Sequence, residues 1–304
     1  MLALAVMAGV LAACRESAAP AARATTAVGA PRVVVLSPAL ADTMRDLGMG
    51  DVIVGRHGFD AWTNPAVPVC GDQAGIDYEA LLRAGPTHVL LQTAGVPPRL
   101  MDLARERGWR VENLEVLSLE QVRSAARWLA ENVPADAGAR ARALASPALV
   151  AMDEAGGGGW GRRPGIDPER IGRVLLMIPG RRAGGLGPGS FHHQVLESLG
   201  GRPALETGAP YIELDAEAVE RLSPGAIILL APRRPGTASR AGLLDAAALE
   251  ELLGPSARLR VPAMTRGRVL LIDDPKCLLP STALLGVAQE MARALERWSA
   301  EGPG

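Results

Sequence analysis

The sequence predicts an α/β protein of two similar Rossmann-like lobes, each with a parallel sheet. Three observations lead to this class. Apolar runs of strand length, such as residues 32–36 and 174–178, alternate with helical patterns along the chain. Residues 76–91 are echoed in register, 138 positions later, by residues 214–229. A helix-to-strand unit used once in each half indicates two lobes of one design.

Both copies of the repeat have the pattern of a helix followed by a buried strand. Asp77 or Asp215 is placed to cap the helix, a proline marks its end, and an apolar run of strand length follows. The repeat also puts one acidic residue in the first turn of each helix, Glu79 in one copy and Glu217 in the other. Matched carboxylates on matched lobes indicate a protein that holds something between two similar halves.

The first lobe, residues 31–134, is expected to alternate strands and helices from its start. Ser37 is placed to cap the first helix, with Pro38 in its first turn. A polar stretch at 56–75 is expected to be a long loop. The predicted strands are 32–36, 52–54, 88–91 and one that opens at 109–111, and the predicted helices are 38–48, the repeat helix, 98–107 and 118–131.

The segment 135–165 is expected to join the lobes as an interlobe helix and a Gly-rich linker. Pro147 is expected to kink or split the helix, and four glycines at 156–159 end it. The second lobe, residues 166–304, repeats the alternation of the first. Its predicted elements are a strand at 174–178, a Gly-rich loop at 184–190, a helix at 191–199, the second repeat unit, a helix near 245–253, a strand at 269–272 and a final helix from about 282.

The N-terminus resembles a bacterial lipoprotein signal peptide, predicted at residues 1–14. Residues 1–13 are uncharged and apolar, and small residues precede Cys14, which would become the lipidated first residue. The alternative is a buried N-terminal helix with a chance cysteine. Residues 15–30 are expected to be a flexible tether. We therefore expect a protein in the periplasm or at the cell surface that is anchored to the membrane through lipid alone.

Composition narrows the partners and the chemistry. The formal net charge of the 304 residues is −1, which gives no indication of nucleic-acid binding. Apart from Cys14 the chain has two cysteines, Cys70 and Cys277, which would form a disulfide, ligate a metal or stay free. No tight Cys or His spacing indicates a metal site built by the protein. We expect no catalytic residue and no cofactor of the protein's own.

Several segments form an ordered set along residues 31–300. They are RVVVLSPA at 32–39 with DLG at 46–48, AGPTHVL at 84–90, GPGSF at 187–191 with LGG at 199–201, LSPGAII at 222–228 and GRV at 267–269. Together they resemble the periplasmic binding proteins of ABC importers for iron-siderophores, haem and cobalamin, the class III receptors.

The resemblance implies two α/β lobes joined by a long helix, with a bound chelate in the cleft. It also implies delivery of that chelate to an ABC permease dimer with a cytoplasmic ATPase. By position, Glu79 and Glu217 are the acidic residues that would dock against the permease. The alternative for each is a carboxylate that merely complements the helix dipole, a contribution of about 0.3–1 kcal/mol.

The ligand is expected beyond the carboxyl ends of the strands, where open α/β sheets bind their ligands. Aromatic side chains would supply flat apolar faces, amides and hydroxyls would supply hydrogen bonds, and cations would bind anionic groups. The predicted ligand-binding residues are Ser37, Pro38, Ala39, Phe59, Trp62, Asp72, Gln73, Gln92, Thr93, Arg181, Arg182, Phe191, His192 and Lys276.

The expected ligand is a cobalt or iron chelate, and a corrinoid such as cobalamin is favoured. The loops of both lobes carry aromatic residues, which suit a flat and nearly neutral ligand. Only three cations, Arg56, Arg181 and Arg182, are placed to converge on the ligand, whereas an anionic siderophore needs several arginines. A ferric siderophore or haem is the alternative within the same family. A chelatase-like tetrapyrrole enzyme is the alternative of another class, although the loop at 184–190 lacks the phosphate-binding patterns.

Overall fold

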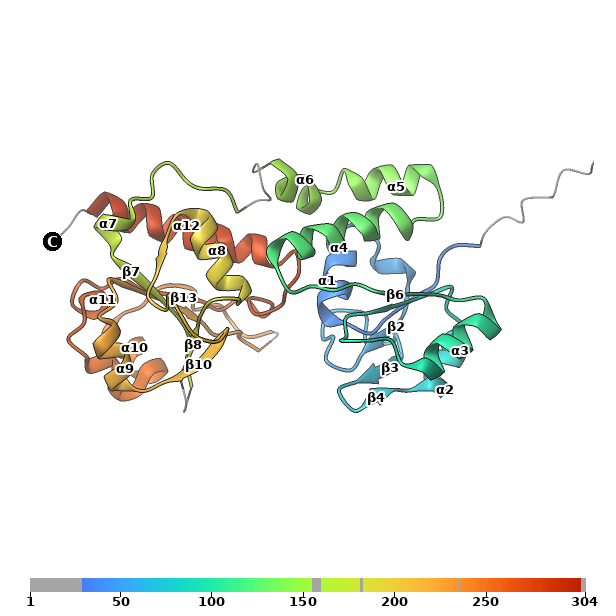
Figure 1. Cartoon of the computed structure of the whole chain (residues 1–304), viewed down its shortest axis with the longest axis horizontal. Coiled ribbons are helices and arrows are strands. Elements are labelled where there is room, and N and C mark those ends of the chain that lie inside the picture. Colours follow the sequence, from blue (N-terminus) through green and yellow to red (C-terminus); the bar gives the residue numbers. More distant parts are fainter. Residues whose placement is uncertain (1–28, 155–159, 181–182, 235, 302–304) are drawn as a thin grey trace, which may run out of the picture.

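The computed structural model describes residues 29–154, 160–180, 183–234 and 236–301. Within these residues the chain forms two α/β lobes that lie side by side, one coloured blue to green and the other yellow to red (Figure 1). Cys14, Arg181 and Arg182 lie outside the described residues, so their predicted roles stay predictions.

The first lobe is a sheet with helices on both faces. Its strands are β1 (Val33–Val35), β2 (Ile53–His57), β3 (Val69–Asp72), β4 (Gly75–Ile76), β5 (His88–Leu91) and β6 (Arg110–Asn113). Its helices are α1 (Pro38–Asp46), α2 (Tyr78–Ala84), α3 (Pro98–Arg107) and α4 (Leu119–Asn132), with a short 3-10 helix, η1 (Gly50–Val52). The strand order is β4-β3-β2-β1-β5-β6, and all neighbouring strands are parallel except β3 and β4.

Alternate side chains of the central strand are buried against opposite helical layers. Val33 and Val35 pack with α1 and α4, whereas Val34 packs with α2 and α3. Burial of both faces explains why this strand has a continuous apolar sequence rather than an alternating one.

The second lobe has the same layered plan. Its strands are β7 (Arg173–Ile178), β8 (Ala183–Leu186), β9 (Arg202–Pro203), β10 (Tyr211–Leu214), β11 (Ala226–Leu230), β12 (Gly242–Leu243) and β13 (Val269–Ile272). Its helices are α7 (Pro168–Ile171), α8 (Phe191–Leu199), α9 (Ala216–Leu222), α10 (Ala246–Leu253), η2 (Gly254–Arg258), α11 (Pro262–Thr265) and α12 (Leu284–Glu301). The order is β10-β8-β7-β11-β13-β12, with β9 beside β7, and β7, β11 and β13 form its parallel centre.

The repeated segments form equivalent helices, as predicted. The side chain of Asp77 caps α2 and that of Asp215 caps α9. Both helices end in a left-handed residue, which is Gly85 in the first copy (φ 54°) and Ser223 in the second (φ 44°). β5 and β11 then enter the sheets directly beside the central strands β1 and β7.

The connecting segment contains two helices, α5 (Ala137–Leu144) and α6 (Pro147–Glu154), rather than one. The split at Pro147 is confirmed. Ala145 ends α5, and the hydroxyl of Ser146 accepts a hydrogen bond from the backbone N–H of Leu149 in α6 (3.3 Å). α5 and α6 lie beside α4 along one edge of the molecule (Figure 1).

Two expected loops contain strands instead. The predicted loop at 56–75 includes β3 and β4, and the predicted Gly-rich loop at 184–190 begins with β8. Glycines in these strands hid the strand pattern, because they supply no apolar side chain. Glycine is needed there: a Cβ on Gly184 would lie 2.0 Å from the ring of Tyr211, and one on Gly71 would lie 3.0 Å from the carbonyl oxygen of Gly75.

One hydrophobic core runs through both lobes. The cluster that contains Val33 and Leu40 of the first lobe continues through Leu129 of α4 to Leu196 of α8 and Trp298 of α12. Separate clusters fill the outer face of each sheet. The lobes are therefore joined by packed side chains as well as by the connecting chain.

Polar contacts also join the lobes, on one face of α1. The hydroxyl of Ser281 donates to Asp42 (2.8 Å) and that of Thr282 donates to Asp46 (2.6 Å). Asp42 and Asp46 lie one helical turn apart, so both acidic groups face the same segment of the second lobe. This arrangement fixes the position of that segment against the first lobe.

Candidate functional site

A pocket of about 620 Å³ lies in the first lobe where its parallel strands end. Residues after β1, at the end of β2 and after β5 form one wall, and the β3–β4 hairpin and the start of α2 form the other. This is the edge at which open α/β sheets bind ligands. The lining residues are Leu36, Ser37, Pro38, His57, Gly71, Asp72, Gln73, Gly75, Ile76, Tyr78, Leu91, Gln92, Thr93 and Pro97.

Six of the predicted ligand-binding residues line this pocket together: Ser37, Pro38, Asp72, Gln73, Gln92 and Thr93. They come from three segments, at 37–38, 72–73 and 92–93, that are far apart in the sequence. The parallel sheet brings these segments to one edge. Ile76, Tyr78 and Pro97 also line the pocket but were not among the predicted ligand-binding residues. They lie at or just before the starts of α2 and α3.

The polar groups on one wall of the pocket are held in place by neighbours. The hydroxyl of Ser37 caps α1 and donates to the side-chain oxygen of Gln92 (2.7 Å). This bond fixes the orientation of the Gln92 amide and leaves its NH2 group to donate a hydrogen bond to a ligand. The backbone of Thr93 is held at both its N–H and its carbonyl by the side chain of Asn113 in β6 (3.0 and 2.8 Å).

His57 and Asp72 are the imidazole and the carboxylate that line this pocket. Burial lowers the pKa of His57, although nearby Asp72 and Asp60 act in the opposite direction. Its Nδ1 accepts the backbone N–H of Phe59 (3.1 Å), so the neutral ring carries its proton on Nε2. The pocket therefore offers a carboxylate, a neutral imidazole, and several amide and hydroxyl groups.

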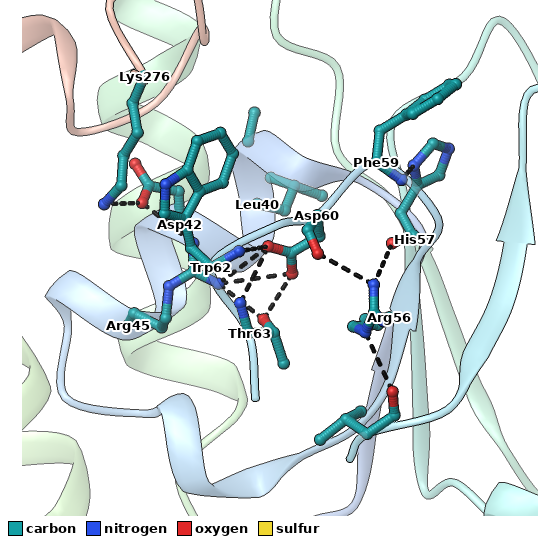
Figure 2. Close-up of polar contacts among 12 residues, drawn as sticks. Leu40, Asp42, Arg45, Arg56, His57, Phe59, Asp60, Trp62, Thr63 and Lys276 are labelled. Carbon is teal, nitrogen blue, oxygen red and sulfur yellow. Dashed lines mark hydrogen bonds and ion pairs between the residues drawn. The ribbon is translucent and has the colours of Figure 1, made fainter. Parts of the chain in front are cut away.

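Phe59 and Trp62 lie on the loop that follows β2, outside the lining of the pocket. Phe59 is 60% exposed, and its ring centre lies 5.5 Å from that of His57 (Figure 2). Trp62 is half-buried beside the ammonium of Lys276. Phe59 is an exposed apolar surface directly next to a pocket-lining imidazole.

Four other predicted residues are not on a free surface of the cleft. Ala39 is buried in α1, and Phe191 is packed partly against the shared core. His192 is buried, with Nε2 2.6 Å from the carbonyl oxygen of Cys277, and burial lowers its pKa so that the ring is neutral. The Nζ of Lys276 lies 2.6 Å from Asp42. These placements give the four residues packing or pairing partners within the protein.

The second lobe presents groups at its own sheet edge that the sequence analysis missed. Arg233 and Arg234 come three and four residues after the end of β11, and Arg234 is exposed. Tyr211 is 49% exposed, with its ring against Gly184. For the arginines the signal was available, because the residues after a buried parallel strand belong to the ligand-binding edge.

Glu79 and Glu217 are exposed at equivalent places in α2 and α9. Their side chains are 81% and 86% exposed, and each pairs with an arginine one turn later, Arg83 at 2.6 Å and Arg221 at 3.7 Å. Exposed pairs of this kind contribute little to stability, about 0.5 kcal/mol or less. Neither carboxylate is needed to hold its helix, because Asp77 and Asp215 already cap them.

The two remaining cysteines are free thiols in different cores. Cys70 packs with the outer cluster of the first lobe and Cys277 with the core shared by both lobes. Burial raises the pKa of Cys70 to about 11 and that of Cys277 to about 12. Of the three expected states, these two cysteines therefore do not form the disulfide.

No group of three or more His, Cys, Asp or Glu side chains in the described part of the chain is arranged to hold a metal ion. No helix among the same residues is long and apolar enough to cross a membrane.

A second cavity, of about 530 Å³, lies away from the strand ends, between the turn after α1 and helix α5. Its lining is mostly Ala, Val, Leu, Met and Pro, and its polar members are Asp46, Asp51, Arg142 and Ser146. Because it lacks the converging amide and hydroxyl groups of the other pocket, we take the pocket at the strand ends as the candidate site.

Comparison with known proteins identifies the fold. No protein-family model matches the chain, and no curated protein matches it by sequence. Among solved structures, the periplasmic haem-binding protein BhuT in complex with two haems is 24% identical, with 89% of this chain and 100% of that chain covered and a TM-score of 0.64. The periplasmic vitamin B12-binding protein BtuF of Vibrio cholerae is 16% identical, with 88% and 98% covered and a TM-score of 0.64.

The petrobactin-binding protein YclQ of Bacillus subtilis is 14% identical, with 88% of this chain and 93% of that chain covered and a TM-score of 0.59. These three structures are of binding proteins rather than enzymes. The match extends over both lobes of each of them. This chain therefore has the two-lobe fold shared by periplasmic binding proteins for haem, vitamin B12 and petrobactin.

Proposed function

We propose that the protein is the substrate-binding component of an ABC importer and captures a metal chelate between its lobes. The observation that carries this proposal is the pocket at the carboxyl ends of β1, β2 and β5. It combines apolar surface with fixed hydrogen-bonding groups from three segments, as expected of a small-molecule site. The shared fold of the haem-, vitamin B12- and petrobactin-binding proteins supports the same reading.

The two lobes would recognise different parts of the chelate. The pocket of the first lobe offers Asp72, neutral His57 and the amide of Gln92, which suit a neutral or hydrogen-bonding edge. The facing edge of the second lobe would contribute the ring of Tyr211 and the cation of Arg234, which suit an apolar face and an anionic group. A flat chelate with acidic side groups would satisfy both.

The preference for a corrinoid loses one of its premises in the structure, because Phe191 of the second lobe packs partly against the shared core. Arg56 is not free to bind a ligand, because it donates to the carbonyl oxygens of Val67 and Asp60 (both 3.0 Å). Arg233 is likewise paired within the protein, with Asp273 (3.8 Å), whereas the exposed Arg234 adds positive charge that the sequence analysis had not counted. We therefore propose a cobalt or iron chelate and rank corrinoid, haem and ferric siderophore equally.

Titration of the purified protein with haemin, cobinamide and a ferric siderophore tests the proposal, with absorption spectra and calorimetry as readouts. We expect one-to-one binding of at least one chelate at sub-micromolar Kd. Gln92→Ala should weaken it about tenfold, the worth of one hydrogen bond to a buried site. Gln289→Ala, at an exposed position on α12, is the matched control. Absence of binding to all three chelates would reject the proposal.

Delivery to a permease is the second half of the proposed function. We propose that Glu79 and Glu217 dock against cationic groups of the permease, one from each lobe. Changing both to Arg should abolish uptake in cells and leave the Kd for the chelate unchanged, because reversed charge at a docking contact is repulsive. Reversal of Glu106 and Glu296, exposed on α3 and α12, is the control.

A change in chelate affinity in the Glu79 and Glu217 double variant would place these residues in the ligand site or the fold instead. The proposed location is the periplasm or cell surface, with a lipid anchor on Cys14 as the only membrane attachment. Metabolic labelling with a fatty acid tests the anchor, since Cys14→Ser should remove the label. Retention of the label in that variant would contradict it.

A further inference from the structure

The side chain of Lys276 reaches from the second lobe to a buried carboxylate of the first (Figure 2). Lys276 follows β13, and its Nζ lies 2.6 Å from Oδ1 of Asp42 in α1. The carboxylate of Asp42 is fully buried, and its Oδ2 accepts a hydrogen bond from Ser281 (2.8 Å). The second lobe thus supplies two of the partners of a buried charge in the first.

A second buried carboxylate, Asp60, organises the loop that carries the aromatic residues. It accepts hydrogen bonds from the backbone N–H groups of Trp62 (3.1 Å) and Thr63 (3.2 Å). Arg45 lies between the two carboxylates, with Nη1 3.4 Å from Asp60 and Nη2 3.1 Å from Asp42 (Figure 2). The backbone of the loop is therefore tied to α1 by charged groups.

The indole of Trp62 completes the connection between the lobes. The ammonium of Lys276 lies 5.9 Å from the centre of the Trp62 ring, within the range of a cation–π interaction. One ammonium group thus contacts both a buried carboxylate of α1 and an aromatic face of the loop after β2. The charge of Lys276 is therefore paired within the protein, with a carboxylate that has no exposure to solvent.

We propose that Lys276 is a positioning residue, which holds the Trp62 indole and its loop against the second lobe and does not bind the ligand. The effect of this role on ligand binding rests on the proposed function. Phe59 lies three residues before Trp62 and beside the pocket-lining His57, so the position of the loop sets where this exposed ring stands. The loop would move with the second lobe and not independently of it.

The chemistry of the side chain suits this role. Lys276 is the only lysine among the 304 residues, and all the other long cationic side chains are arginines. An ammonium is a compact point charge with three donors, whereas a guanidinium is a wide planar fork. A compact group fits between a carboxylate and a ring, and we therefore expect Arg at this position to restore the contact only in part.

The test compares Lys276→Met, Lys276→Arg and the wild-type protein, each labelled with 5-fluorotryptophan. The chain has five tryptophans, and a Trp62→Phe variant assigns the resonance of Trp62. We expect Lys276→Met to shift or broaden the Trp62 resonance alone, and Lys276→Arg to return it part of the way. The Kd for whichever of haemin, cobinamide and a ferric siderophore binds should rise about tenfold in Lys276→Met.

An unchanged Trp62 resonance in Lys276→Met would overturn the proposal. So would a loss of affinity confined to the anionic chelates with the resonance unmoved, because that pattern identifies a direct ligand contact. If the wild-type protein binds none of the chelates, the proposed function fails while the resonance still decides the positioning role. If Lys276→Met does not fold, the double variant with Asp42→Asn removes both charges and carries the same measurement.

Discussion

The buried carboxylate of Asp42 should be one of the most sensitive polar positions in the protein. Asn at this position keeps the size of the side chain and removes its charge. The group accepts from Arg45 (3.1 Å), Lys276 (2.6 Å) and Ser281 (2.8 Å) and has no exposed surface. Breaking a fully buried pair by removal of one partner costs about 3–5 kcal/mol.

Two features of the site reduce that figure for Asp42→Asn. The side chains of Arg45 and Lys276 are 19% and 27% exposed, so water reaches part of each cation, and Arg45 also keeps Asp60. We therefore expect a loss of about 2–3 kcal/mol in the free energy of unfolding, between the buried and the surface limits. At about 2 °C per kcal/mol for a chain of this size, Tm should fall by about 4–6 °C.

Thermal and urea unfolding followed by circular dichroism measure this loss. The matched control is Asp102→Asn, whose partner Arg105 lies at a similar distance (2.7 Å) but on the exposed face of α3. That variant should change stability by about 0.5 kcal/mol or less. Equal stability of the two variants would refute the reasoning, because it would mean that the interlobe charge cluster contributes no more than a surface pair.

Three further outcomes are expected. Burial lowers the pKa of His192, so below about pH 6.5 the unfolded chain takes up a proton that the folded chain refuses. Stability should fall as pH decreases below that value, and in His192→Gln the slope should be shallower by up to about 1.4 kcal/mol per pH unit; an unchanged slope contradicts the burial argument. Burial raises the pKa of Cys70 and Cys277 to about 11 and about 12, so iodoacetamide at pH 8 should modify both only after denaturation, as mass spectrometry would show. X-ray scattering profiles with and without a bound chelate should nearly overlay, because packed side chains join the lobes, and a large contraction would count against this.

Local signals predicted most of the elements. Asp77, Asp215 and Ser37 cap the helices for which they were proposed, and Pro147 divides the connecting segment. These features depend on residues a few positions apart, and short-range chemistry is what a sequence displays. The short strands β3, β4 and β8 escaped because glycines carry part of each strand, and only their close neighbours in the folded sheet require glycine there.

The site was predicted in part for the same reason. Ser37, Gln92 and Asp72 follow from the rule that ligands bind at the ends of parallel strands. Lys276 also follows a strand, and the same rule therefore assigned it to the ligand. Its partner Asp42 is 234 positions away, with no local feature that marks it as buried, so only the folded chain shows that the charge is already paired.

The core that spans both lobes bears on how such a protein can be recombined. In protein engineering, a two-lobe binding protein is a candidate for lobe exchange, in which one lobe is kept with its ligand contacts and the other is replaced. Here a graft cut within residues 135–165 would separate Leu129 of α4 from Leu196 of α8 and from Trp298 of α12, which belong to one buried cluster. A functional chimera would have to carry over the inner faces of α4, α8 and α12 as a set, together with the residues that meet α1. The natural unit of exchange is therefore the outer half of each lobe, with its strand ends and loops, on a retained central scaffold.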